Sequence, residues 1–350
     1  MPRVRFSYQT LVEQSADGIV RAIEVADELG FHACYAADET YHKDAWQLMA
    51  LAAKRTKRIR LGPGVAPILL RDPALIAQAA ATLDELSGGR AEVVISTGNF
   101  ALLEQHGVEA ERRPLGRLRE AHHVIRTFLD TGRLDFAGDF YRYSGLFTAA
   151  RPVQERVPVK LGGMRGPRSF QLAGEISDGL LTACACSPEA LRFAADNLFA
   201  GAAVSGRDPS SLDLADSILC AISHDGESAR VAARAAAAFY IPSMPAELLA
   251  RHGLDPERVA PIVEAFARGD VPAALELATP DITDPISIAG TADEWIERIR
   301  GDFVPNGMNH LVLVLIDSPL VESWCGVRVE VPDTLTQLRL IAERVLPEFT

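Results

Sequence analysis

Short apolar runs alternate along the chain with longer stretches in which apolar residues recur every three or four positions. The run at 310–316 is almost wholly apolar, as in a strand buried on both faces, whereas 17–29 has the spacing of an amphipathic helix. Gly30 ends that helix, and Asp72 is the predicted N-cap of a helix at 73–86. The same patterns predict strands at 4–9, 33–37, 59–65, 91–96, 157–161, 179–183, 212–223 and 310–316.

Helical patterns separate these eight strands, so we expect parallel strands joined by helices. The predicted fold class is a (β/α)8 TIM barrel with insertions, and an open doubly wound sheet is the alternative. Two stretches interrupt the alternation. The first, near 132–156, is rich in aromatic residues and suits a hairpin, and the second, near 240–293, is mostly helical and lacks strand signals. Because no linker divides the chain, we predict a single domain over 1–350 that carries both insertions.

Composition and charge exclude several classes of partner. The net charge is -12 and no run rich in lysine and arginine occurs, so nucleic acid is not an expected partner. No stretch of about eighteen residues is wholly apolar and the N-terminus lacks the apolar segment of a signal peptide, so we expect a cytoplasmic protein with no membrane partner. Of the five cysteines only Cys184 and Cys186 are close together, which is a weak metal pattern, and we predict buried, reduced thiols.

The strand predicted at 59–65 runs into residues that cannot continue a regular ladder, namely Gly62, Pro63, Gly64 and Pro67. In a barrel, ligands bind at this end of the strands, and glycines there let a flat molecule approach the main chain. A plain strand end is the alternative. The candidates to line a site at the strand ends include Tyr8, Asp38, Glu39, Gly64, Val65, Thr97, Gly98, Asn99, Gly162, Gly163, Met164, Arg165 and Ala183.

The segment 159–169 carries the strongest single signal, a strand that ends in Gly162 and Gly163 and enters a helix. Backbone N–H groups at a helix start, with Arg165 and Arg168 close by, suit a phosphate. A structural turn is the alternative, since neither a Walker A motif nor G-x-G-x-x-G is present.

Asp38 and Glu39 are adjacent at a strand end, so their side chains point to opposite sides and only one can face the centre of a barrel. One is a candidate proton donor or hydrogen-bonding partner, and the other a loop charge. The strand ends hold no set of residues with the spacing of a metal site, no lysine suited to a Schiff base and no Gly-x-Ser-x-Gly motif of a hydrolase.

Seven short motifs are spread over nearly the whole chain. They are Ala26-Asp27-Glu28-Leu29-Gly30-Phe31, Ala36-Ala37-Asp38, Leu61-Gly62-Pro63-Gly64-Val65, Leu83-Asp84-Glu85-Leu86-Ser87-Gly88-Gly89-Arg90, Leu103-Glu104-Gln105-His106-Gly107-Val108, Leu161-Gly162-Gly163 and Ile176-Ser177-Asp178-Gly179. In this order the chain resembles the luciferase-like superfamily, specifically its coenzyme F420-dependent branch, and most closely the methylenetetrahydromethanopterin reductase-like members.

The resemblance implies a (β/α)8 barrel, usually a homodimer, that binds a deazaflavin or flavin at the carboxyl ends of its strands. It implies a non-proline cis peptide between Gly64 and Val65 behind the cofactor ring, with Asp38 at the reactive face. By the same likeness, the phosphate is held by main-chain N–H groups of Gly162, Gly163 and Met164, and the cleft is lined by Thr97, Gly98, Asn99 and Ala183.

Two positions depart from the relatives. The F420-dependent sugar-phosphate and alcohol dehydrogenases of this family have a histidine and a tryptophan where this chain has Glu39 and Lys43, so neither activity is expected. We expect an oxidoreductase that transfers a hydride between F420 and a small organic substrate, with Asp38 or Glu39 handling protons. The alternatives are an FMN-dependent monooxygenase of the same fold, a barrel that acts as a binding subunit without catalysis, and a phosphosugar-binding barrel enzyme.

Overall fold

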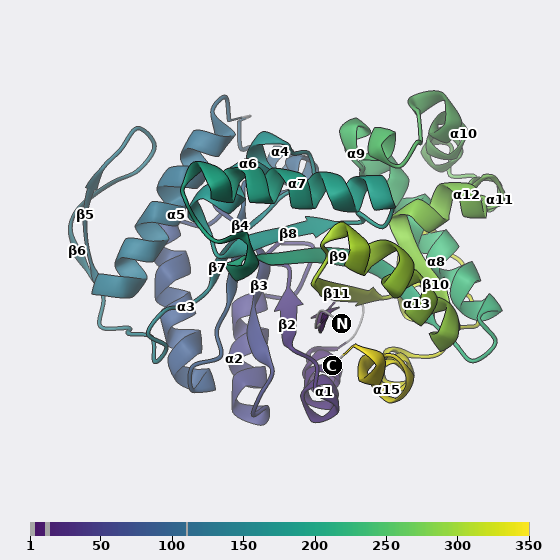
Figure 1. The fold of residues 1–350 in the computed structure, drawn as a ribbon, viewed down its shortest axis with the longest axis horizontal. Helices are drawn as coiled ribbons and strands as arrows, with labels where there is room; N and C mark the ends of the chain where they lie inside the picture. The colour runs from purple at the N-terminus through teal and green to yellow at the C-terminus, as the bar shows by residue number, and fades with distance from the viewer. Residues whose placement is uncertain (1–3, 11–14, 110, 350) are drawn as a thin grey trace. The chain divides into compact units, whose positions relative to one another are not determined.

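The computed structural model describes residues 4–10, 15–109 and 111–349 (Figure 1). The chain divides into two compact units, each described by itself: the first unit (Met1–Gln9, Thr182–Asp196 and Leu214–Thr350) and the second unit (Thr10–Leu181 and Asn197–Asp213). Among the described residues, no helix is both long enough and apolar enough to cross a lipid bilayer.

Parallel strands form the centre of the second unit. In order of pairing they are β2 (Ala33–Ala36), β3 (Arg60–Pro67), β4 (Val93–Ser96), β7 (Val159–Gly162) and β8 (Gly179–Ala183). Most of their side chains are buried on both faces, which explains why these runs lack the polar alternation of a half-exposed strand.

Helices follow these strands, and their ends carry the predicted signals. Asp72 caps α3 (Pro73–Ser87) by accepting a hydrogen bond from the N–H of Ala74 at 2.8 Å. Gly30 ends α1 (Ala16–Leu29) with the left-handed backbone that favours glycine (φ 89°). The remaining helices of the second unit are α2 (Ala45–Arg55), α4 (Phe100–Gln105), α5 (Pro114–Thr131) and α6 (Arg168–Ile176), and α7 (Pro188–Val204) has residues in both units.

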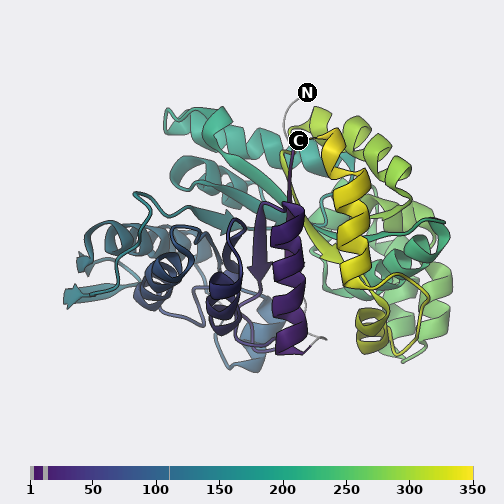
Figure 2. The same ribbon diagram turned by 90° about the horizontal axis from the view of Figure 1, so that it is seen from below.

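The stretch near 132–156 contains an antiparallel hairpin of β5 (Arg133–Ala137) and β6 (Arg142–Phe147), at the outer edge of the second unit in both ribbon views (Figures 1 and 2). It is attached to α5, because the carboxylate of Glu120 accepts a hydrogen bond from the N–H of Phe140 at 3.0 Å. That this hairpin is an insertion into a single domain stays a prediction.

The first unit contains parallel strands paired in the order β10 (Ser287–Gly290), β9 (Asp213–Ile222), β11 (His310–Leu315) and β1 (Arg5–Thr10). The long strand β9 pairs with both β11 and β10. The helices of this unit are α8 (Glu227–Tyr240), α9 (Ala246–Arg251), α10 (Pro256–Ala267), α11 (Val271–Leu277), α12 (Pro280–Thr283), α13 (Ala292–Arg298), α14 (Ser318–Cys325) and α15 (Thr334–Arg344).

All eight predicted strands are present, and the order of strands and helices is that of a (β/α)8 barrel. The stretch 240–293 was predicted without a strand, and β10 corrects this. Its four residues, Ser-Ile-Ala-Gly, are too few to show a period, and serine, alanine and glycine give little preference for a strand. The short helices α4 and α14 were also not predicted.

Candidate functional site at the strand ends

The carboxyl ends of β3, β4 and β7 lie side by side, because these strands are parallel neighbours. Gly64 is opposite Val94 in the β3–β4 pairing, and Ile95 is opposite Leu161 in the β4–β7 pairing. The register of β3 shifts between Gly64 and Ala66, as expected where glycine and proline interrupt a strand. The segments that follow these three strands therefore meet at one edge of the sheet.

The peptide bond between Gly64 and Val65 is cis, as the resemblance predicted. The side chain of Tyr35 packs directly against this main chain: a β-carbon on Gly64 would stand 2.8 Å from the Cβ atom of Tyr35, closer than real contacts allow. Glycine is therefore required here by packing, whatever binds at the strand ends.

Val65 packs in turn on the glycine pair of β7. A β-carbon on Gly162 would stand 2.7 Å from the Cγ1 atom of Val65, so these two strand ends are in close contact. The amide of Gly163 donates a hydrogen bond to the carbonyl of Leu181 at 3.0 Å. The predicted phosphate contact of Gly163 therefore cannot use this N–H while that hydrogen bond is intact.

The loop 163–167 between β7 and α6 carries positive charge and no acidic residue. The guanidinium of Arg165 lies over the ring of Phe100, 4.8 Å from its centroid, and Arg168 is the first residue of α6. The loop enters α6 through a second cis bond, Gly166–Pro167, which was not predicted. A cationic loop at a helix start is suited to an anion.

Thr97, Gly98 and Asn99 connect β4 to α4. Gly98 has a φ of 107°, which favours glycine, and a β-carbon there would stand 3.1 Å from Cβ of Pro67. The Oδ1 atom of Asn99 accepts a hydrogen bond from the N–H of Ala101 at 3.0 Å and so caps α4. Thr97 is half-buried at the strand end.

Asp38 is an anchor between β2 and β3. Its carboxylate accepts hydrogen bonds from Nε1 of Trp46 at 2.9 Å and from Nε of Arg71 at 2.8 Å, and its side chain is only 9% exposed. Its own N–H donates to the carbonyl of Val65 at 3.1 Å. Two donors already occupy the carboxylate, which suits a positioning role better than proton transfer.

Glu39 is in different surroundings from its neighbour. Burial raises the pKa of Glu39 above its usual 4.5, and the charge of Asp38 adds to this rise. The loop that carries it is tied to the end of α4, where Thr40 Oγ1 and His106 Nε2 are 2.9 Å apart. Of the two predicted acids, Glu39 is the one whose environment favours a bound proton.

A buried charge network supports the same part of the sheet. The ammonium of Lys160 pairs with the carboxylates of Glu92 and Asp213, and the side chains are 3%, 3% and 7% exposed, respectively. The hydroxyl of Tyr35 donates to Glu92 and accepts from Nζ of Lys160 at 3.1 Å. Burial by itself raises the pKa of Glu92, but Lys160, aided by Arg60, outweighs it and lowers the pKa to about 2. The network fixes the Tyr35 ring that packs against β3.

Tyr8 and Ala183 belong to the first unit. Tyr8 is buried in β1 opposite Leu313, and Ala183 is the last residue of β8. The next residue, Cys184, has a φ of 55°, which is unusual for a residue with a side chain, and its N–H donates to the carbonyl of Ser217 at 2.8 Å. Contact of Tyr8 and Ala183 with a cofactor stays a prediction.

Asp216 is buried in the first unit beside the cysteine pair. Its carboxyl accepts a hydrogen bond from the N–H of Ala185 at 3.1 Å, and the thiol of Cys186 lies 4.0 Å from Oδ2. Burial raises the pKa of Asp216 to about 8. All five cysteines are buried with free thiols, as predicted, and no group of three or more potential metal ligands occurs within the described part of the chain.

The sequence interpretation missed the residues that hold the strand ends in place: Tyr35, Trp46, Arg71 and Lys160. Only Lys160 gave a signal, since a lysine within the apolar run 157–161 must be paired if that strand is buried. The partners of Asp38 are 8 and 33 residues away along the chain, and no local pattern relates them.

Taken together, these features define a barrel-type α/β protein with a ligand site made largely of main chain at the carboxyl ends of its strands. The model of the luciferase-like monooxygenase family matches residues 3–310, so the chain belongs to this family.

The relatives are similar over most of their length. The chain is 30% identical over 331 residues to the 5,10-methylenetetrahydromethanopterin reductase of Archaeoglobus fulgidus, covering 93% of this chain and 94% of that protein. It is 33% identical over 283 residues to the protein of the same name from Methanolobus tindarius, covering 81% and 85%. The structure of the coenzyme F420 dependent tetrahydromethanopterin reductase from Methanopyrus kandleri matches with a TM-score of 0.90 at 28% identity, over 99% of this chain and 100% of that chain. The predicted (β/α)8 barrel is thereby confirmed.

Proposed function

We propose that this protein transfers a hydride between coenzyme F420 and a small organic substrate. The protein is an oxidoreductase of the luciferase-like family and F420 is its cofactor, in line with relatives of 30% and 33% identity named as reductases and a matching structure described as F420 dependent. The observation that carries the proposal is the meeting of Gly64 and Val65 with Gly162 and its cationic loop at one edge of the sheet.

The residues at this edge fit a flat cofactor that carries a phosphate. Val65, Thr97 and Gly162 are half-buried at the ends of strands whose other residues are mostly buried, so the edge is accessible from one side. When bound, F420 supplies the ring that gives or accepts the hydride. In our proposal Gly64 and Val65 back the ring, the phosphate is held by Gly162, Met164 and Arg165 with Gly163 in close approach, and the cleft is lined by Tyr8, Thr97, Gly98, Asn99 and Ala183.

The two acids have separate roles in this proposal. Asp38 positions the backbone behind the ring, because it is bonded to Trp46 and Arg71 through its side chain and to Val65 through its N–H. Glu39 holds the proton that accompanies hydride transfer, because its raised pKa keeps its carboxyl protonated to higher pH than usual.

Single-turnover absorbance measurements test this proposal. Reduced F420 is mixed with the protein and a methylenetetrahydropterin, an imine or an enone, and oxidised F420 with alcohols. We expect at least one substrate to change the deazaflavin spectrum in the presence of wild-type protein only. Binding of F420 with no turnover of any candidate would instead favour a binding subunit, and oxygen-dependent turnover with reduced FMN would favour a monooxygenase.

We further propose that the protein is a homodimer, on the basis of the family resemblance. Light scattering of the eluting peak in size-exclusion chromatography measures this directly. A mass of one chain, 37.8 kDa, across the working concentration range would contradict it.

A further inference from the structure

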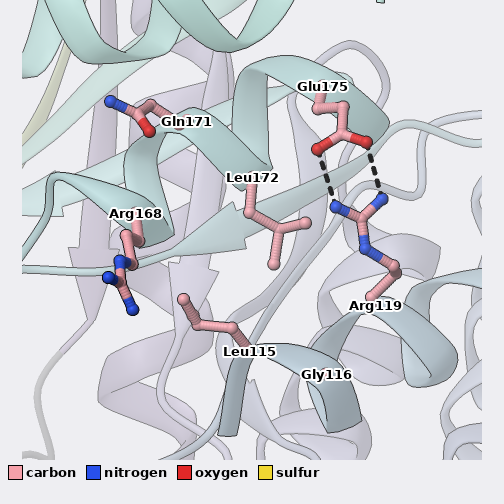
Figure 3. A pocket seen from close by; sticks show the side chains of 7 residues that line it. All are labelled: Leu115, Gly116, Arg119, Arg168, Gln171, Leu172 and Glu175. Carbon is pink, nitrogen blue, oxygen red and sulfur yellow. Dashed lines mark hydrogen bonds and ion pairs between the residues drawn. The ribbon is translucent and has the colours of Figure 1, made fainter.

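A pocket of about 260 Å³ lies between the first turns of α5 and the length of α6, within the second unit (Figure 3). Its middle is apolar, with Leu115 and Leu172 facing each other. At one end the guanidinium of Arg119 makes two hydrogen bonds with the carboxylate of Glu175, at 2.8 and 2.6 Å. The other end is formed by Arg168 and Gln171.

The pocket is too small for a tricyclic ring. Sites that enclose whole small molecules measure roughly 300–1,000 Å³, so this one suits a fragment about the size of an amino acid. Among the described residues the side chain of Arg168 makes no ion pair or hydrogen bond, whereas Glu175, the pocket's one acid, is neutralised by Arg119. The free cation therefore favours an anionic fragment with a short apolar stem, such as a carboxylate on a methylene chain.

The position of the pocket relates it to the proposed cofactor site. Arg168 is the first residue of α6 and follows directly on the loop 163–167, to which we assign the phosphate. F420 carries glutamate residues beyond its phosphate, linked through lactate, so a chain of carboxylates continues from that point. Charge on this loop and at the mouth of the pocket is positive, although the whole chain has a net charge of -12.

We propose that the pocket between α5 and α6 binds a glutamate residue of the F420 tail, with its carboxylate on Arg168 and its methylene groups between Leu115 and Leu172. This inference rests on the proposed function, and it adds a subsite that reads tail length. Its prediction is selective: Arg168 contributes to the affinity for tailed F420 and not to the affinity for the tail-free form that ends at the phospholactate.

Fluorescence titrations with the two forms of the cofactor test this. We expect wild-type protein to bind tailed F420 more tightly than the tail-free form, and Arg168→Gln to remove about two- to five-fold of affinity for the tailed form only, as for a partly exposed ion pair. Arg142→Gln, which removes an exposed charge from the hairpin, should leave both affinities unchanged. Glu175→Gln should strengthen binding of the tailed form, because it frees Arg119 for the ligand.

The outcomes separate the possible sources of an effect. Equal losses for both forms in Arg168→Gln would mean that Arg168 binds the phosphate, and unchanged affinities would mean that the tail is in solvent; either overturns the inference while the proposed function stands. Competition by millimolar free glutamate against the tail-free form would indicate an independent carboxylate site and would also overturn it. Failure of wild-type protein to bind either form would remove the proposed function and this inference together.

Discussion

The Cγ1 atom of Val65 lies 2.7 Å from the position that a β-carbon on Gly162 would occupy. Two strand ends that are 97 residues apart in sequence thus share one contact, and the residues around it are half-buried at the accessible edge of the sheet. The proposed ring and phosphate contacts lie on either side of this contact, so its geometry should affect both.

Gly162→Ala should weaken F420 binding while the protein stays folded. The added methyl group must displace Val65, and overpacking of this kind costs about 1–3 kcal/mol. Gly163→Ala is the matched control, because a β-carbon there meets nothing closer than Ser169 Oγ at 3.4 Å. Titration of both variants with F420, alongside thermal unfolding, measures the difference. Equal affinities for the two variants would contradict a role for the Val65–Gly162 contact in binding.

Glu39→Gln should lower turnover by about 100-fold or more while F420 binding is retained, as for loss of a general acid. The raised pKa also predicts a stability effect. A carboxyl whose pKa is higher in the folded state contributes stability below its ordinary value of 4.5, and this is lost as pH rises through the raised pKa. Glu39→Gln should therefore be more stable than wild type at neutral pH and not below pH 4.5.

Asp38→Asn is the comparison for Glu39. It weakens the ion pair with Arg71, so it should lower stability without shifting the pH dependence of turnover. The assignment of the proton to Glu39 fails if the pH profile moves in Asp38→Asn and stays unchanged in Glu39→Gln.

Lys160→Met should destabilise the fold by about 3–5 kcal/mol, because it leaves the buried carboxylates of Glu92 and Asp213 without their cation. Lys54→Met, at an exposed position, should change stability by less than about 0.5 kcal/mol. Urea unfolding measures both. The lowered pKa of Glu92 contributes stability that is present above pH 4.5 and lost as pH falls towards about 2, so the variant should unfold at higher pH than wild type during acidification.

Asp216→Asn should become stabilising as pH rises. The pKa of Asp216 is raised from 3.8 to about 8, so the contribution of its proton is complete below 3.8 and is lost as pH rises through about 8. The advantage of the variant should grow by at most about 1.4 kcal/mol per pH unit in this window and level off above it. A difference in unfolding free energy that does not vary between pH 4 and pH 8 would show that Asp216 is not buried as a neutral acid.

Sequence patterns predicted the elements whose signals are local. Alternating apolar runs located all eight expected strands, and the caps at Asp72 and Gly30 were identified because each acts within a few residues of itself. The four residues of β10 were missed, because their placement in the sheet comes from pairing with β9 and not from their own composition.

The site was predictable in part. Adjacent glycines at the ends of β3 and β7 indicated where a ligand could approach, but the isomer of the Gly64–Val65 bond came from family resemblance alone, since residue type does not encode it. The distinction between Asp38 and Glu39 required the structure, because it depends on Trp46 and Arg71. Contacts between distant residues decide which of two like side chains is free to take part in chemistry.

The most direct test of the account is the choice of cofactor. Purified protein is titrated separately with F420 and with FMN, and binding is followed through the absorbance and fluorescence of each ring. Our account predicts saturable binding of F420 and much weaker binding of FMN, with the F420 affinity lowered in Gly162→Ala. Tight binding of FMN with no detectable binding of F420 would contradict it.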